Sequence, residues 1–303
     1  KELRGRKDEG AIPVMRVPGS LLKRFLDETF ERYHHPGYIS PDPLELVYRY
    51  HDPLDREIVG LLASSLAYGR VAQILRSAEW VLEWMGPSPR AFLEGARKPD
   101  LEDAFLGFRH RFSTHGELVN LLMGIQGAIR RHGSLGACFR SGMRPGDETT
   151  AGALCAFVRE LRAPDDTGYS SLVPRPEKNS ACKRLHLYLR WMVRSDEIDP
   201  GVWTGISPSL LIVPLDTHMF GTCRVLGMTS RSQACIPAAL EITRAFRKID
   251  PQDPVKYDFS LTRIGIRREE DLSRMIASCA GRAIQGGRNG RKDPGCRVSG
   301  IHG

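Results

Sequence analysis

The feature that most constrains this chain is the helical spacing of its apolar residues. In residues 71–86, VAQILRSAEWVLEWMG, apolar side chains recur every three or four positions and so share one face of a helix. These side chains are Val71, Ile74, Leu75, Ala78, Val81, Leu82 and Met85. Alternating runs of β-branched residues ended by tight turns, which are typical of strands, are nearly absent. The sequence therefore predicts a mostly α fold.

Several other segments predict further helices. They are residues 21–33, 43–51, 53–69, 116–133 and 150–162. With 303 residues, of which 41% are hydrophobic, the chain can form a substantial core in one large domain or two small ones. Seven cysteines, an odd number without a tight cluster, favour a reducing cytoplasm over a disulfide framework. We expect a cytoplasmic protein, because the chain lacks both a membrane-spanning apolar run and the apolar stretch of a secretory signal.

The net charge of +8 comes from the two ends of the chain. Residues 1–24 carry seven basic and three acidic residues, and residues 267–303 carry eight and four. The intervening core is balanced, with 29 of each. We expect residues 1–19 and 268–303 to be flexible basic tails around a unit formed by residues 20–267. Such tails add only weak, salt-sensitive affinity for phosphates, so an argument for nucleic-acid binding must rest on the core.

The stretch NSACKRLHLYLRWMVR, residues 179–194, predicts a helix with Lys183 in its first turn. Its apolar residues fall on one side, whereas Lys183, Arg190 and Arg194 fall in line on the opposite side. The stretch contains no acidic residue. A stripe of this kind is either a solvated face or a surface that follows a phosphate backbone, and the helix alone does not distinguish the two.

A second informative stretch is SPSLLIVPLDTHMFGTCRVLG, residues 207–227. An apolar run ends at Asp216, and a new helix is expected directly after it, which predicts Asp216 as the N-cap. A carboxylate held at a helix start, at the end of a buried run, also suits chemistry that must stabilise a cation. The two roles are compatible.

Together, CKRLHLYLRWMVR and VPLDTHMFGTCRVLG resemble the helix-hairpin-helix DNA glycosylases. The signature of these enzymes is a hairpin, a helix that carries a lysine, and a Pro-x-Asp-x-His segment that opens the next helix. The resemblance implies two interleaved helical subdomains with the active site in the cleft between them, and a hairpin and catalytic segment over residues 174–227. The separation of 33 residues between Lys183 and Asp216 is similar to the archaeal branch specific for 8-oxoguanine. Residues 20–267 also resemble a prokaryotic family of unassigned function.

The resemblance assigns the catalytic roles to two residues. Lys183 would attack the sugar C1′ of a flipped damaged nucleotide, and Asp216 would assist. Attack requires the uncharged amine, which the start of a helix and the neighbouring cations Arg184 and Arg190 favour. The resulting Schiff base would permit β-elimination of the 3′ phosphate.

The expected DNA contacts flank these two residues. They are Asn179, Ser180, Arg184, Arg190, Arg194 and His218. The glycine-rich hairpin of the family is absent, and PEKNSACKR stands in its place. We expect Asn179 to adopt the left-handed backbone that glycine normally provides, and Ser180 to cap the helix.

The expected partner is double-stranded DNA with a damaged base flipped from the stack, bound by a monomer in the nucleoid. We expect removal of an oxidised purine, with 8-oxoguanine the first candidate, followed by strand cleavage without a metal or cofactor. Cys223, Cys235, Cys279 and Cys296 are too scattered for the iron–sulfur cluster of the endonuclease III branch. Two alternatives stay open: a monofunctional glycosylase for another lesion, and a non-catalytic nucleic-acid-binding protein with the same fold.

Overall fold

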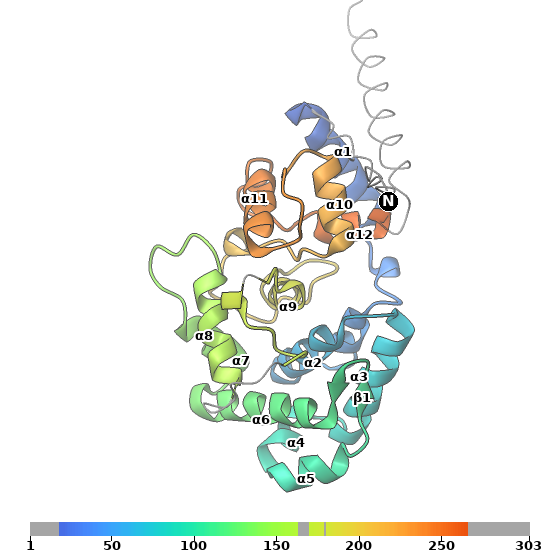
Figure 1. Cartoon of the computed structure of the whole chain (residues 1–303), viewed down its shortest axis with the longest axis vertical. Helices are drawn as coiled ribbons and strands as arrows, with labels where there is room; N and C mark the ends of the chain where they lie inside the picture. Colours follow the sequence, from blue (N-terminus) through green and yellow to red (C-terminus); the bar gives the residue numbers. More distant parts are fainter. Residues whose placement is uncertain (1–17, 163–169, 179, 266–303) are drawn as a thin grey trace, which may run out of the picture.

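A computed structural model describes residues 18–162, 170–178 and 180–265 (Figure 1). The expected tails lie outside these residues, except for Pro18 and Gly19. Within the described part, the chain is mostly α, as predicted, and its strands form one two-stranded hairpin. None of the helices in this part is long and apolar enough to cross a membrane.

The helices and strands follow one another in this order. They are α1 (Gly19–Tyr33), η1 (Pro36–Tyr38), η2 (Pro43–Arg49), α2 (Pro53–Leu66), α3 (Val71–Met85), α4 (Pro89–Gly95), α5 (Lys98–Ala104), β1 (Arg109–His110), β2 (Ser113–Thr114), α6 (His115–His132), α7 (Leu135–Ser141), α8 (Ala151–Leu161), η3 (Pro176–Lys178), α9 (Lys183–Val193), η4 (Pro208–Leu210), α10 (Thr217–Val225), α11 (Ile236–Arg247) and α12 (Asp258–Gly265). All of the predicted helices are present, although residues 43–49 form a 3₁₀ helix.

Local capping explains where the longer helices begin and end. Asp52 accepts a hydrogen bond from the Leu54 amide at the start of α2, at 2.8 Å. A capping box formed by Thr114 and Glu117 opens α6, and Gly133, with φ 84°, ends it. These signals are local in sequence, which is why the helix boundaries could be predicted closely.

Helix α9 lies at the centre of the molecule, with α2 packed against it (Figure 1). Helices α1, α10 and α12 pack together on one side of α9, and α3 to α8 lie on the other. Gly60 lets α2 approach closely, because a Cβ there would lie 2.8 Å from the Met192 side chain of α9. Because α1 and α12 contact each other, the start and the end of the described chain meet beside the central helix.

A buried carboxylate ties α2 to α7. Glu57 is 2% exposed and accepts hydrogen bonds from the amides of Leu135 and Gly136 and from the Trp203 indole, at 2.7, 2.9 and 2.9 Å. Burial raises the pKa of Glu57, and these three hydrogen bonds act in the opposite direction. The carboxylate is thus satisfied by donors from two distant segments.

A buried ionic network holds the second half of α9. Asp199 is fully buried and accepts a hydrogen bond from Arg190 at 3.1 Å and one from Arg194 at 2.8 Å. Arg190 also pairs with Asp258, and Arg194 with Asp253 at 2.6 Å. The network joins α9 to the loop that follows it and to the start of α12.

The predicted basic stripe on α9 is therefore wrong for two of its three members. Arg190 and Arg194 are only 3% and 6% exposed, so they do not form a surface along a DNA backbone. The helix itself lacks acids, but the acids that neutralise the two arginines come from residues 196–199 and 253–258. Arg190 was also expected to favour the uncharged amine of Lys183. It adds little positive potential there, because Asp199 and Asp258 balance its charge.

We expect Asp199→Asn to destabilise the protein by about 3–5 kcal/mol, because it leaves two buried arginines without their shared countercharge. Urea unfolding monitored by circular dichroism measures the change. The control is Glu94→Gln, which removes the exposed partner of Arg90 and should cost less than about 1 kcal/mol. Equal effects of the two substitutions would contradict the role given to the network.

Candidate functional site

Three helices begin close together around the predicted site. Lys183 is the first residue of α9, Asp216 precedes α10 as its N-cap, and Asp258 is the first residue of α12. The Lys183 Nζ lies 3.8 Å from an Asp216 carboxylate oxygen, and both side chains are about 30% exposed. The structure thus brings the two predicted catalytic residues together. The acid that is missing from the lysine's own helix is supplied by a segment 33 residues later.

The predicted N-cap role of Asp216 is confirmed. Its Oδ1 accepts a hydrogen bond from the Met219 amide at 2.8 Å, whereas Oδ2 faces Lys183. Residues 211–215, which lead to it, are buried. The two carboxylate oxygens therefore have separate partners, and the cap fixes the orientation of the oxygen that faces the lysine.

The turn before Lys183 differs from the prediction. Cys182 is the N-cap of α9 and has a left-handed backbone, with φ 43°. Ser180 does not cap the helix, because its hydroxyl accepts a hydrogen bond from the Cys182 amide, one residue before the helix begins. Asn179, the residue expected to be left-handed, lies outside the described residues. A non-glycine residue in this conformation is strained, so the lysine follows directly on a constrained backbone position.

Asp258 is a site residue that the sequence reasoning missed. It is 3% exposed, one oxygen pairs with Arg190, and the other is buried without a hydrogen-bond partner among the described residues. Burial raises the pKa of Asp258 to about 6; Arg190 and Lys183 act to lower it, and Asp216 acts to raise it. Asp258 therefore lies within electrostatic reach of both Lys183 and Asp216. In the sequence, the segment PVKYDF was a candidate for part of the lesion pocket, but Asp258 itself gave no signal beyond helix capping and packing.

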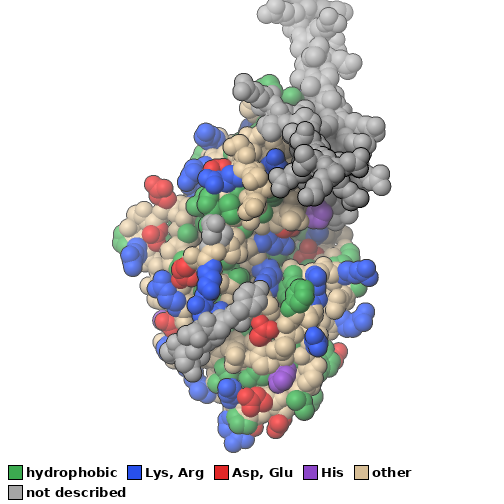
Figure 2. Space-filling model, in the orientation of Figure 1, with side chains coloured by type: hydrophobic (Ala, Val, Ile, Leu, Met, Phe, Trp, Pro, Cys, Tyr) green, Lys and Arg blue, Asp and Glu red, His purple; other side chains and the backbone are tan. Residues whose placement is uncertain are grey.

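A basic cavity of about 350 Å³ adjoins Lys183. Its lining residues are Arg162, Ser170, Pro174, Arg175, Lys178, Ser180, Cys182, Lys183 and Arg184. Five of these described residues are basic and none is acidic. Figure 2 shows basic side chains gathered across the middle of one face of the molecule. A cavity with this lining favours an anionic ligand such as phosphate.

Arg184 is held in place on the wall of the cavity. Its guanidinium donates hydrogen bonds to the backbone carbonyls of Ser65 and Ser171 and lies 4.8 Å from the centre of the Tyr68 ring. Tyr68 in turn donates a hydrogen bond to the His110 carbonyl at 2.8 Å. This expected DNA contact is therefore rigidly positioned by α2 and by the β1–β2 hairpin.

The tip of that hairpin carries an exposed aromatic residue. Phe112 is 75% exposed, and the Arg111 guanidinium lies 5.3 Å from its ring centre. Arg111 has φ 53° and also lies over Tyr68, at 5.8 Å. The contacts from Phe112 through Arg111 and Tyr68 link the hairpin tip to Arg184, which lines the basic cavity. Nothing in the sequence distinguished Phe112 from a core phenylalanine.

The remaining predicted contact, His218, is exposed in the first turn of α10. The structure therefore groups most of the predicted site around the starts of α9 and α10. It excludes Arg190 and Arg194 from the surface, and it adds Asp258 and Phe112. The roles of these residues in binding and catalysis stay predictions.

The model of a protein family of unknown function, DUF2400, matches residues 42–267. The chain belongs to this family. The match confirms the expected likeness to a family of unassigned function, and it spans Lys183, Asp216 and Asp258. No curated protein and no solved structure matches the chain.

The raised pKa of Asp258 predicts a specific pH dependence of stability. A carboxyl whose folded pKa lies near 6, above its unfolded value of about 3.9, favours folding most below pH 4 and least above pH 6. Relative to Asp258→Asn, we therefore expect wild-type protein to lose about 2 kcal/mol of unfolding free energy between pH 4 and pH 7. Urea unfolding of both proteins across this range measures the difference. A difference that is constant, or that grows with pH, would contradict the assignment.

Proposed function

We propose that this protein is a DNA glycosylase with an associated lyase activity, in which Lys183 is the nucleophile. The observation that carries the proposal is the Lys183–Asp216 pair, at 3.8 Å, whose lysine lines a basic cavity. An amine and a carboxylate at this separation suit attack on a sugar carbon and stabilisation of the positive charge that develops there. The resemblance of the two segments to helix-hairpin-helix glycosylases supports the same chemistry.

The reaction requires a neutral amine at Lys183, which gives its proton to Asp216 or to water. The amine then bonds to the sugar C1′ as the glycosidic bond breaks, and the electron pair of that bond leaves with the base, which takes up a proton. The sugar ring opens to a Schiff base. Loss of a C2′ proton expels the 3′ phosphate, and hydrolysis of the Schiff base restores the lysine.

Asp258 can support this chemistry from behind the pair. A carboxyl with a pKa near 6 is mostly ionised at neutral pH, so its negative charge acts on the neighbouring pair. Its burial and its pairing with Arg190 hold it in one position. We assign it a positioning role, through its charge, on Lys183 and Asp216.

The surroundings of the pair suit a nucleic acid. The basic lining of the cavity can neutralise backbone phosphates on either side of a flipped nucleotide. Phe112, which is linked to Arg184 on the cavity wall through Arg111 and Tyr68, offers an exposed apolar side chain, and such side chains insert between base steps in proteins that distort DNA. The substrate class proposed is therefore duplex DNA with a damaged base, and an oxidised purine such as 8-oxoguanine is the first to test.

The first test is borohydride trapping on duplexes that carry 8-oxoguanine, other damaged bases or an abasic site. We expect wild-type protein to form a covalent adduct and Lys183→Gln to form none, because the amide cannot make a Schiff base. Denaturing electrophoresis detects the adduct and the cleaved strand. The matched control is Lys178→Gln, which removes another lysine from the same cavity and should keep the adduct.

Three results would contradict the proposal. An adduct that persists in Lys183→Gln would place the nucleophile elsewhere. Binding to every duplex without base release or adduct would favour a nucleic-acid-binding protein, and base release without an adduct would favour a monofunctional glycosylase.

Asp216→Asn separates the chemical role of this residue from its structural role. Asparagine is an equally good N-cap, so the unfolding free energy should change little. We expect the rate of base release in single turnovers to fall about 100-fold or more, because the amide carries no negative charge to stabilise the sugar cation. The comparison variant Asp216→Ala should lose both stability and rate. An unchanged rate in Asp216→Asn would limit this residue to capping.

A further inference from the structure

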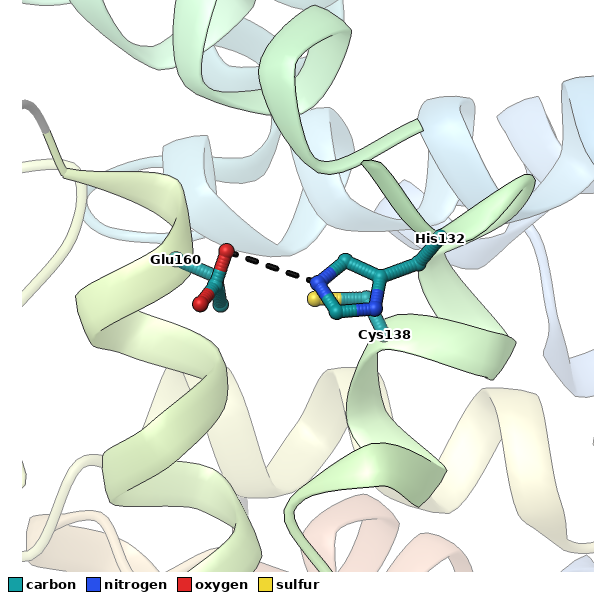
Figure 3. Close-up of side chains that lie close together, drawn as sticks. All are labelled: His132, Cys138 and Glu160. Atoms are coloured by element: carbon teal, nitrogen blue, oxygen red, sulfur yellow. Dashed lines mark hydrogen bonds and ion pairs between the residues drawn. The ribbon is translucent and has the colours of Figure 1, made fainter. Parts of the chain in front are cut away.

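A second cluster of reactive side chains lies outside the Lys183 site, where α6, α7 and α8 meet (Figure 3). His132 ends α6, Cys138 lies in α7, and Glu160 lies in the last turn of α8. One ligand atom from each residue lies within 4.8 Å of the other two. Figure 3 shows the imidazole, the thiol and the carboxylate pointing toward one another from three separate helices.

We propose that His132, Cys138 and Glu160 bind a zinc ion. Imidazole, thiolate and carboxylate are the three protein ligand types of Zn²⁺, and three of them leave one position for water. Thiolate and imidazole together favour zinc over magnesium or calcium, which prefer oxygen ligands. Binding would form three bonds to the metal and release the thiol proton of Cys138 to solvent, with no change of oxidation state.

The geometry supports a shared ion. The His132 Nε2 lies 3.4 Å from the Glu160 Oε2, which is long for a hydrogen bond. A tetrahedral zinc ion holds a nitrogen and an oxygen ligand about 3.3 Å apart, and a nitrogen and a sulfur ligand about 3.6 Å apart. The observed nitrogen–oxygen separation is therefore already that of two ligands of one ion. The sulfur needs at most a shift of about 1 Å, which a side-chain rotation can supply.

The surroundings give the ion both access and support. Cys138 is 1% exposed, whereas the side chains of His132 and Glu160 are 23% and 38% exposed. The cluster is thus closed on the sulfur side and open to solvent on the other. Arg131 donates hydrogen bonds to a carboxylate oxygen and to the backbone carbonyl of Glu160, both at 2.8 Å. It can orient the carboxylate for the metal, as such outer partners do in zinc sites.

The arginine also sets the charge of the site. A zinc ion with one thiolate and one carboxylate is neutral, so Arg131 leaves a single positive charge near the surface. Without an ion, Arg131 and Glu160 form an ion pair, and the His132 imidazole lies beside the same carboxylate. Metal binding would therefore replace a partly exposed ion pair by a link among α6, α7 and α8. Glu160 lies two residues before Arg162, so this link would also steady one wall of the basic cavity.

The test uses the full chain, stripped of metal and titrated with Zn²⁺ against a chromophoric chelator. We expect one zinc ion per chain, a rise in Tm on addition of zinc, and a sulfur-to-metal charge-transfer band with Co²⁺ as the probe. Cys138→Ser should abolish the band. Loss of a residue that only supports a ligand typically weakens metal binding roughly 10- to 100-fold. We expect a larger loss of zinc affinity when a ligand itself is replaced, in Cys138→Ser, His132→Gln or Glu160→Gln.

Three controls make the result decisive. Cys155→Ser removes a cysteine of α8 that is not a proposed ligand, and it should leave zinc binding unchanged. Cys279→Ser and Cys296→Ser remove thiols of the C-terminal segment and should also have no effect. His132→Gln and Glu160→Gln change partly exposed residues, and circular dichroism verifies that they fold. The proposal is overturned if zinc does not bind in stoichiometric amount, if these two variants bind it as well as wild type does, or if binding depends on Cys279 or Cys296.

Discussion

The shared contact of Asp199 with Arg190 and Arg194 is the interaction on which the centre of this protein depends. Two buried guanidinium groups on the central helix are tolerable only because a fully buried carboxylate reaches both. Two further acids, Asp253 and Asp258, complete the pairing from the far end of the described chain. The network therefore holds the start of α12 against α9. It thereby places the Asp258 carboxylate near Lys183.

The candidate site follows from this arrangement. Lys183, Asp216 and Asp258 each stand at the start of a helix, where the positive end of the helix dipole favours a carboxylate and disfavours an ammonium group. Two acids and one amine at three converging helix starts form a compact charge system, and its lysine lines a basic cavity. The DUF2400 match covers all three residues but assigns them no activity, so their chemistry is our proposal.

Much of the fold could be predicted from the sequence, because helical spacing and caps are local. Most of the longer helices, the N-cap at Asp216 and the apolar run before it were predicted and confirmed, whereas α11, with 12 residues, was not predicted. Helices α4, α5 and α7 have seven residues each, which is too short for their spacing to be recognised. The predicted DNA-facing stripe failed at Arg190 and Arg194, because a helical wheel contains no information about acids outside the helix, whether in the loop that follows it or 60 residues away.

The sequence by itself determined the mostly α fold, the start of α10 at Asp216 and the choice of Lys183 as the lysine of interest. The first two depend on residues within a few turns of helix, and the third on the resemblance of two segments to the glycosylase signature. Only the tertiary structure decided which charges are buried and which side chains meet. In the folded chain Lys183 lies beside Asp216, and Arg190 and Arg194 are buried. Packing of three helices also brings His132, Cys138 and Glu160 together. These outcomes depend on long-range packing, where desolvation and the approach of distant segments set the energy of each charge.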